Sequence, residues 1–323
     1  MIVNDSFRPA TDPSRESCEV TQSDLRRWQD IKWDKHTRDI DVDGSRIHLV
    51  DLNPTQDDVV IFLHGISASW RWFVEILPEV ARSHRAIGID LPGFGGSQYS
   101  RGHSSFAALA DSVAATCSTL GITRATFVGH SMGSIVATRL AAEHPGLVER
   151  LVVTGGPILT LTGLTRRPIS TIRDQPRAVA TLLAELITIS LPMPNWLAHR
   201  AARSPKILKA TLGPFVNRTD RLDPELMDQV MSALGAPGSF PALLSTASAD
   251  PSAGLDRITC PTRIIRGPGD PLSPPADVQR FLDAVPTATA VEIEGTGHWP
   301  HIEKPTEFLA ELTAFLDIPA QQR

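Results

Sequence analysis

Three residues of the types used in nucleophilic catalysis each stand in a glycine-containing turn, far apart in the chain: Ser131, Asp270 and His298. Ser131 is the centre of Gly-His-Ser-Met-Gly at residues 129–133, which matches the pattern G-x-S-x-G. In that pattern a strand turns sharply into a helix and presents the serine hydroxyl, because the two glycines allow the backbone to pass where a Cβ would clash. The pattern is short enough to arise also as an ordinary glycine-rich turn.

The order and the surroundings of the other two residues favour the catalytic interpretation. Asp270 ends the turn Gly-Pro-Gly-Asp at 267–270, and His298 follows it by 28 residues in Gly-His-Trp. Ser, Asp, His is the chain order expected when the serine lies in a turn of this kind. In such a triad the serine attacks a carbonyl carbon, the histidine accepts and returns the proton, and the aspartate orients the imidazole.

A loop early in the chain is a candidate for stabilising the negative charge that forms on the attacked carbonyl. The apolar stretch at residues 59–63 ends in His64 and Gly65, where a loop can aim a backbone N–H toward the serine. We expect the amides of Ile66 and Met132 to form a two-donor oxyanion hole.

Other conspicuous side chains have weaker claims to a role. His130, inside the serine motif, and His301, just after the candidate base, are interpreted as structural histidines. Trp70, Trp299 and Leu186 are candidates for lining a substrate pocket, although a tryptophan such as Trp70 more often packs a helix on a sheet. No spacing of His, Cys or carboxylates suggests a metal site, so neither metal nor organic cofactor is expected.

Apolar runs alternate with helix-like stretches and predict the elements that position these residues. A hairpin about Asp43 and Gly44 precedes six continuous apolar runs, which are typical of strands buried on both faces of a parallel sheet. The runs lie at 59–63, 86–89, 125–128, 151–153, 263–265 and 290–293. Helix-like stretches lie at 72–81, 104–120, 132–143, 276–284 and 306–316. The sequence therefore predicts an α/β fold with a doubly wound, mostly parallel sheet of eight strands.

One long stretch interrupts the alternation. Residues 157–250 contain prolines and helical patterns but no convincing strand, and nearly a hundred residues are too many for a loop in a compact domain. We predict an inserted helical cap here, a core made of 39–156 and 251–323, and an N-terminal arm at 1–38. The cap has ten Lys and Arg against seven Asp and Glu, so it is positive by three charges whereas the remainder sums to −8. Its helical patterns lie at 178–189, 196–208, 224–234 and 241–248.

Composition excludes several classes of protein. The 323 residues are 41% hydrophobic and 21% charged with a net charge of −5, which is typical of a globular chain. No long run of like charges suggests nucleic acid, no apolar stretch reaches a membrane span, and the first residues lack a secretory pattern. We expect a cytoplasmic protein with a small-molecule substrate and reduced thiols at Cys18, Cys117 and Cys260, and we leave its oligomeric state open.

With these motifs, residues 39–317 resemble proteins of the α/β-hydrolase fold. The similarity is to the cap-bearing branch, which includes esterases, cofactor-free perhydrolases, C–C bond hydrolases, epoxide hydrolases and haloalkane dehalogenases. Asp-Leu-Pro-Gly-Phe-Gly-Gly-Ser at 90–97 resembles the family's D-x-P-G-x-G-x-S loop, which is structural. The resemblance implies the same three catalytic residues that the motifs indicate.

Residue types within the resemblance favour one branch over the others. Epoxide hydrolases and dehalogenases use an aspartate where this chain has Ser131, and dehalogenases bind halide with a tryptophan where Met132 stands. The only tyrosine, Tyr99, lies outside the predicted cap, in which epoxide hydrolases carry their proton-donating tyrosines. C–C bond hydrolases often have a tryptophan at the place of Trp299, but their oxyanion loop is usually richer in Gly and Pro than residues 64–69.

The sequence thus predicts a serine hydrolase that cleaves a carboxylic ester or lactone of a small, largely hydrophobic molecule through an acyl-enzyme. The apolar helices of the cap favour such a substrate, because a crevice between two bodies is a usual place for a small-molecule site. Two alternatives stay open: a C–C bond hydrolase with the same triad, and a ligand receptor on this fold that does not turn its ligand over.

Overall fold

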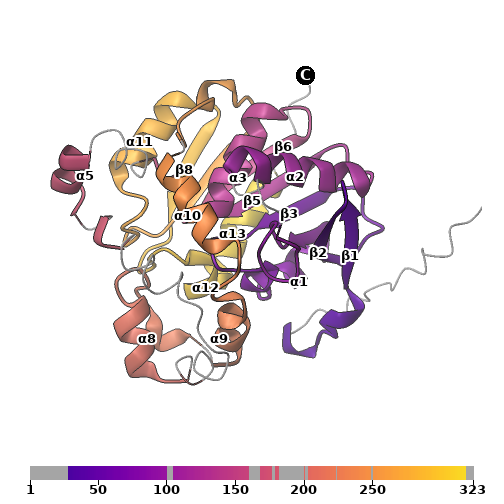
Figure 1. The fold of residues 1–323 in the computed structure, drawn as a ribbon, viewed down its shortest axis with the longest axis horizontal. Coiled ribbons are helices and arrows are strands. Elements are labelled where there is room, and N and C mark those ends of the chain that lie inside the picture. Colours follow the sequence, from indigo (N-terminus) through magenta and orange to yellow (C-terminus); the bar gives the residue numbers. More distant parts are fainter. Residues whose placement is uncertain are drawn as a thin grey trace, which may run out of the picture.

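The computed structural model describes residues 28–99, 105–159, 168–176, 179–181, 200, 203–222, 224–248 and 250–317. Its centre is one eight-stranded sheet with strand order β1-β2-β4-β3-β5-β6-β7-β8. Figure 1 shows this sheet among the helices. The strands are β1 (Thr37–Val42), β2 (Ser45–Leu52), β3 (Val59–Leu63), β4 (Arg85–Ile89), β5 (Ala125–His130), β6 (Val148–Thr154), β7 (Thr262–Arg266) and β8 (Ala288–Glu292). β2 is antiparallel to both of its neighbours, β1 and β4, and all other pairs are parallel. The predicted fold class is therefore confirmed.

Helices follow the strands and lie on both faces of the sheet. They are α1 (Leu77–Val80), α2 (Phe106–Thr119), α3 (Met132–Glu143), α11 (Pro275–Ala284), α12 (Pro300–Glu303) and α13 (Pro305–Leu316). The observed bounds of β3 and α3 are those that the sequence predicts. At the edge of the sheet, Asp43 and Gly44 form the predicted tight hairpin turn, with φ of 51° and 78°.

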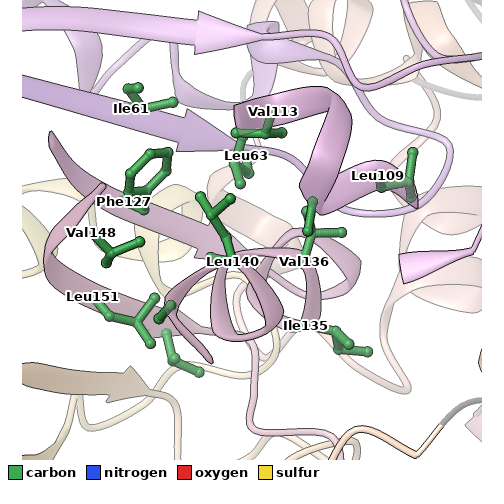
Figure 2. Packing of buried hydrophobic residues seen from close by; sticks show 14 of the residues in the cluster. Ile61, Leu63, Leu109, Val113, Phe127, Ile135, Val136, Leu140, Val148 and Leu151 are labelled. Atoms are coloured by element: carbon green, nitrogen blue, oxygen red, sulfur yellow. The ribbon is translucent and has the colours of Figure 1, made fainter. Parts of the chain in front are cut away.

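The side chains of the central strands divide between two apolar clusters, one on each face. Ile61 and Leu63 of β3 join the cluster that contains residues of α2 and α3, whereas Val60 and Phe62 join the cluster that contains residues of α13. Successive side chains of a strand point to opposite faces, so a continuous apolar run is buried on both sides. Figure 2 shows side chains of the first cluster, among them Leu109 and Val113 of α2 and Ile61 and Leu63 of β3.

The helix predicted at residues 72–81 is wrong in its extent. The structure has instead a 3₁₀ helix, η3 (Trp70–Phe73), followed by the single-turn α1. Pro78 explains the break, because a proline has no N–H to donate and its ring conflicts with the carbonyl four residues earlier. Pro78 is accommodated in the first turn of α1, where its missing N–H has no intrahelical partner to lose.

The segment between β6 and β7 is helical in its described parts. It contains α5 (Pro168–Asp174), α8 (Pro205–Leu212), α9 (Pro224–Val230) and α10 (Ser239–Ser248), with short 3₁₀ turns η4 (Thr219–Arg221) and η5 (Met231–Ala233). α8 begins at Pro205 and continues to Leu212, later than the predicted range of 196–208. Most of the helix predicted at 178–189, and Leu186 with it, lies outside the described residues. That this segment forms a separate cap remains a prediction.

Ahead of the sheet, two 3₁₀ turns, η1 (Trp28–Asp30) and η2 (Trp33–Lys35), attach the end of the predicted arm to the body. The ring of Trp33 lies 5.1 Å from that of Trp70, and its Nε1 donates to the carbonyl oxygen of Trp28 at 2.9 Å. Within the described ranges, no helix combines the length and the apolar character that a bilayer crossing requires.

Candidate active site

Ser131 occupies a strained turn between β5 and α3. Its φ is 53° and its ψ −119°, a backbone conformation that is uncommon for a residue with a side chain. Glycines on both sides make the turn possible: a Cβ on Gly133 would overlap the carbonyl oxygen of Leu63, and one on Gly129 would overlap that of Gly133. This is the strand–turn–helix context that the motif requires.

Hydrogen bonds fix the backbone of the turn on both sides of the serine. The N–H of Ser131 donates to the carbonyl oxygen of Thr154 in β6 at 2.9 Å. Its own carbonyl oxygen accepts the Ser134 hydroxyl at 2.6 Å and the Ser134 N–H at 2.9 Å. Ser131 also immediately precedes α3, and the N-terminal end of a helix favours negative charge.

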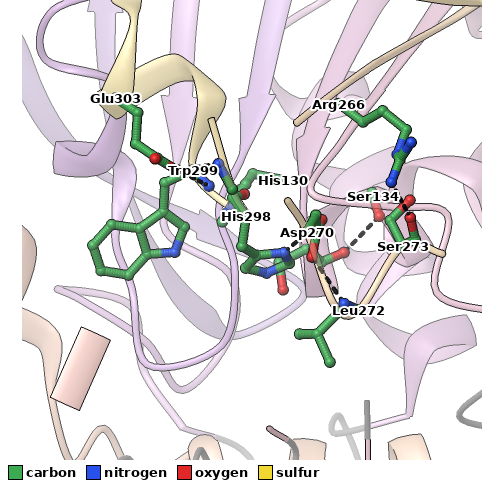
Figure 3. A network of polar contacts seen from close by, with 11 residues as sticks. His130, Ser134, Arg266, Asp270, Leu272, Ser273, His298, Trp299 and Glu303 are labelled. Carbon is green, nitrogen blue, oxygen red and sulfur yellow. Dashed lines mark hydrogen bonds and ion pairs between the residues drawn. The ribbon is translucent and has the colours of Figure 1, made fainter. Parts of the chain in front are cut away.

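The structure brings Asp270 and His298 together. The Asp270 Oδ2 lies 2.9 Å from Nδ1 of His298, and both side chains are buried. Asp270 Oδ1 accepts the N–H of Leu272 at 2.9 Å, and Arg266 at the end of β7 donates to the carbonyl oxygen of Ser273 at 2.6 Å. Figure 3 shows this network. An imidazole that donates from Nδ1 to a carboxylate has Nε2 as its basic nitrogen.

The loop of His298 lies against the turn of Ser131. His130, the residue before the serine, places Nε2 3.1 Å from the carbonyl oxygen of His298, and the two rings lie 5.1 Å apart. A Cβ on Gly155, which follows β6, would come within 3.0 Å of both the His130 ring and the His298 carbonyl oxygen. The serine motif, the end of β6 and the histidine loop therefore meet at the carboxyl end of the parallel strands.

The loop after β3 reaches the same place. A Cβ on Gly65 would lie 3.2 Å from Cβ of Ser131, so this loop and the serine turn are in contact. His64 fixes the loop: its Nδ1 lies 2.7 Å from the carbonyl oxygen of Gly65, and its Nε2 accepts the N–H of Leu91 at 3.0 Å. Burial lowers the pKa of His64 to about 4, so the imidazole is neutral. Ile66 and Met132, the predicted oxyanion-hole residues, lie in the two segments that meet here.

Comparison with known proteins agrees with this geometry. Residues 60–312 match the sequence profile described as Alpha/beta hydrolase family. The chain belongs to this family. It is 28% identical over 285 residues to a 2-hydroxy-6-oxononadienedioate/2-hydroxy-6-oxononatrienedioate hydrolase of Pseudomonas sp., covering 85% of this chain and 93% of that protein.

Solved structures share the fold of this α/β hydrolase at low sequence identity. A thermophilic esterase from Thermogutta terrifontis superposes with a TM-score of 0.65 at 23% identity, covering 87% of this chain and 97% of the esterase. The enol-lactonase from Burkholderia xenovorans LB400 superposes with a TM-score of 0.64 at 20% identity, covering 86% and 99%.

The loop at residues 90–97 of the hydrolase supports the segment that follows the loop after β3. Asp90 accepts the N–H of Trp70 on Oδ1 at 2.7 Å and the N–H of Gly96 on Oδ2 at 2.8 Å. The Ser97 hydroxyl donates to the Asp90 carbonyl oxygen at 2.6 Å. Burial raises the pKa of Asp90, and the two N–H bonds oppose that shift. These contacts fit the structural role that the sequence predicts for the loop.

The predicted pocket residues lie in different places. Trp70 is fully buried in the core against Trp33, the packing role that the sequence left open for it. Trp299 is buried next to His298, with its ring 4.7 Å from that of Trp72 and 6.1 Å from that of Phe215. Leu186 is outside the described residues. Contact of these side chains with a substrate remains a prediction.

Sequence reasoning missed Glu303, which ends α12. This buried carboxylate accepts four backbone N–H groups. Burial raises its pKa, and the four hydrogen bonds counteract that shift. A glutamate five residues after a histidine has no spacing that distinguishes it from a solvated carboxylate, so the sequence offers no signal for this role.

His301 packs beneath the site without a hydrogen-bond partner for either ring nitrogen among the described residues. Its ring lies 4.5 Å from that of His130 and 5.1 Å from that of Phe73. Burial lowers the pKa of His301 to about 3 and that of His130 well below its ordinary value, so both are neutral. Both histidines fit the structural interpretation made from the sequence.

Proposed function

We propose that this α/β hydrolase is a serine hydrolase that cleaves a carboxylic ester or lactone of a small, largely hydrophobic molecule. The observation that carries the proposal is the buried hydrogen bond between Asp270 and His298, on a loop that touches the strained turn of Ser131. A buried carboxylate and imidazole beside a serine in this backbone conformation are the parts that a triad requires.

The proposed reaction has two halves. In the first, Oγ of Ser131 attacks the carbonyl carbon while Nε2 of His298 takes the hydroxyl proton, and the C–O bond to the leaving alkoxide breaks as that proton passes to it. In the second, water attacks the acyl carbon and gives a proton to the same nitrogen. The bond from the acyl carbon to Oγ then breaks, Nε2 passes the proton to Oγ, and the carboxylic acid leaves. Asp270 holds the imidazole tautomer and stabilises its charged form.

The oxyanion that forms in each half would accept N–H bonds from Ile66 and Met132. The contact between the Gly65 loop and the Ser131 turn supports this assignment, because it brings both amides into segments that adjoin the serine. Backbone donors fixed in advance stabilise such a charge strongly, at a cost of about 3 kcal/mol when one is lost.

The preference for an apolar substrate rests on the segment between β6 and β7, which we propose as a cap at residues 157–250. Part of it packs on the body near Trp299 through apolar side chains, so the surroundings of the base are hydrophobic. These side chains are Leu208, Leu212, Phe215, Leu226, Met227 and Val230. Apolar surroundings exclude water and strengthen the hydrogen bonds to a developing charge.

A C–C bond hydrolase with the same triad is the second candidate. Two observations favour it: the Pseudomonas relative is named as a hydrolase of 2-hydroxy-6-oxononadienedioate, and Trp299 follows the proposed base. The esterase and lactonase of the same fold favour the first candidate by their printed names.

Two measurements test these candidates. A fluorophosphonate probe should label the wild-type protein and leave Ser131→Ala unlabelled. p-Nitrophenyl esters of increasing acyl length, a lactone panel and a coloured vinylogous diketone then separate the reactions. Turnover of the diketone alone would favour C–C cleavage, and absence of both labelling and turnover would contradict a serine hydrolase and favour the receptor alternative.

A further inference from the structure

The carboxylate of Glu303 holds two segments that are far apart in the chain. Its Oε1 accepts the N–H of Gly297 at 2.9 Å and that of Trp299 at 3.2 Å, the two amides that flank His298. Its Oε2 accepts the N–H of Asn217 at 2.8 Å and that of Arg218 at 3.1 Å. Glu303 is buried, with 1% of its surface exposed; its bonds from Gly297 and Trp299 are buried, and those from Asn217 and Arg218 are partly buried.

Residues 215–218 also contact the loops of both triad partners directly. The carbonyl oxygen of Phe215 accepts the N–H of His298 at 2.7 Å, and a Cβ on Gly297 would overlap that same oxygen. A Cβ on Gly269, next to Asp270, would overlap the side-chain amide of Asn217. The amide of Asn217 in turn donates to the carbonyl oxygen of Thr296 at 3.1 Å.

These four residues begin three positions after the end of α8 at Leu212 and belong to the segment proposed as the cap. Leu208 and Leu212 of α8 are buried in the same apolar cluster as Phe215. The position of this helix and the position of residues 215–218 are therefore mechanically linked. The cap segment thus supplies the Phe215 carbonyl oxygen to the N–H of His298 directly. It also supplies the N–H groups of Asn217 and Arg218 to Glu303, whose other oxygen accepts the amides beside His298.

We propose that Glu303 is a positioning residue that couples the cap to the base: its carboxylate seats His298 only while residues 215–218 are in place. The proposal rests on the proposed function, since it assigns His298 as the base. A displacement of the cap segment would withdraw the Phe215 carbonyl oxygen from His298 and two of the four N–H donors from Glu303, and so lower activity without any change in Ser131.

The proposed role of Glu303 needs both the charge and the shape of its carboxylate. A carboxylate offers two equivalent oxygens with acceptor capacity for all four N–H groups, and bonds to a charged acceptor are stronger than neutral ones. A glutamine keeps one oxygen and turns an NH₂ toward two N–H donors. Glu303→Gln therefore breaks the bridge between the two segments with almost no change in volume, and each segment loses the support of the other.

The test combines hydrogen–deuterium exchange with kinetics on the full-length protein. In Glu303→Gln we expect faster exchange at residues 217–218 and at residues 297–299. We expect kcat to fall about 100-fold with little change in KM, the size of effect that a displacement of roughly 1 Å produces. Glu303→Asp, which keeps the charge but is one methylene shorter, is measured in the same way if the glutamine variant does not fold.

Two matched controls separate positioning from general destabilisation. Glu307→Gln makes the same change on a half-exposed carboxylate that pairs with Lys304 at 3.4 Å, and should leave exchange and kcat unchanged. Asp51→Asn removes a buried carboxylate of β2 that pairs with Arg38 of β1 and Arg85 of β4, and should lower Tm without lowering kcat.

The proposal is overturned if Glu303→Gln leaves kcat unchanged, or if exchange rises at only one of the two segments, 217–218 or 297–299, while kcat is retained. It is also overturned if Asp51→Asn lowers kcat as much as Glu303→Gln does at an equal loss of Tm. Failure of the proposed function gives a different result, namely a wild-type protein with neither probe labelling nor turnover. In that case the exchange at 217–218 and 297–299 still decides whether one carboxylate couples the two segments.

Discussion

His130 supports the backbone of His298: its Nε2 lies 3.1 Å from the His298 carbonyl oxygen, inside a fully buried environment. A carbonyl oxygen can only accept, so Nε2 of His130 carries the hydrogen, and the ring is the neutral tautomer that burial favours. The residue before the proposed nucleophile thus holds the residue proposed as its base. The two halves of the site are joined by a hydrogen bond that does not include the serine hydroxyl.

The first prediction concerns this bond. His130→Phe keeps a ring of similar size but leaves the buried carbonyl oxygen of His298 without its donor, which costs about 1–3 kcal/mol of unfolding free energy. We expect lower Tm and lower kcat together. His301→Phe is the control, because that ring lies in the same cluster and has no hydrogen bond among the described residues to lose. Equal behaviour of the two variants would mean that ring packing, not the hydrogen bond, matters here.

Ser131→Ala should abolish hydrolysis while leaving Tm nearly unchanged. Loss of a triad nucleophile costs about 10⁶-fold in kcat. Alanine tolerates the same turn no worse than serine, and the backbone bonds to Thr154 and Ser134 do not involve the lost hydroxyl. Ser118→Ala, an exposed position on α2, is the matched control and should retain full activity. Residual activity of Ser131→Ala close to the wild-type rate would place the nucleophile elsewhere.

Asp270→Asn should lower kcat by about 10⁴-fold, because an amide in place of the carboxylate favours the wrong tautomer of His298. The bond from Leu272 to the side-chain oxygen can persist, so the turn should keep its shape. Steady-state kinetics of this variant beside Glu294→Gln make the comparison. Glu294 is an exposed carboxylate four residues before the histidine, and a larger loss in its variant would transfer the role of the acid to it.

The elements that the sequence predicted well are those whose signals are local. The apolar run of β3 and the helix α3 each depend on a few adjacent residues. The glycine turns and the chain order of Ser131, Asp270 and His298 are local signals too, and the structure brings Asp270 and His298 into a hydrogen bond beside the serine turn. The contacts of Glu303 could not be predicted, because its N–H donors belong to two distant segments, 217–218 and 297–299. No local sequence pattern indicates which loops will bond to one carboxylate.

The error in the helix predicted at residues 72–81 came from one proline within an otherwise helical pattern. The apolar spacing at residues 72–81 favours a helix, but Pro78 restricts α1 to one turn and leaves η3 before it. The place of Trp70 could not be predicted either, because a tryptophan suits a pocket as well as a core. Its contact with Trp33 and the bond from its N–H to Asp90 show how it packs.

The last prediction is that the protein loses stability as the pH falls below about 6.5, because three buried imidazoles stay neutral in the folded state. Burial lowers the pKa of His64 to about 4 and that of His301 to about 3, and holds the pKa of His130 well below 6.5. In the unfolded chain each titrates near 6.5. Between that pH and about 4 the unfolded state therefore binds more protons than the folded state, and the free energy of unfolding decreases as the solution is acidified.

Each such imidazole contributes a slope of up to about 1.4 kcal/mol per pH unit. Asp90 and Glu303 oppose the effect, since burial raises the pKa of each, so that on acidification the folded form takes up its proton before the unfolded form does. The three imidazoles outweigh the two carboxylates, whose pKa shifts are partly offset by hydrogen bonds. The free energy of unfolding therefore still decreases on acidification. Thermal unfolding between pH 4.5 and 7.5 measures it, and His301→Phe should have a shallower dependence than the wild type because it lacks one of the three protons. An unchanged slope in that variant would show that His301 is protonated in the folded protein, contrary to its burial among Phe73, His130 and Phe308.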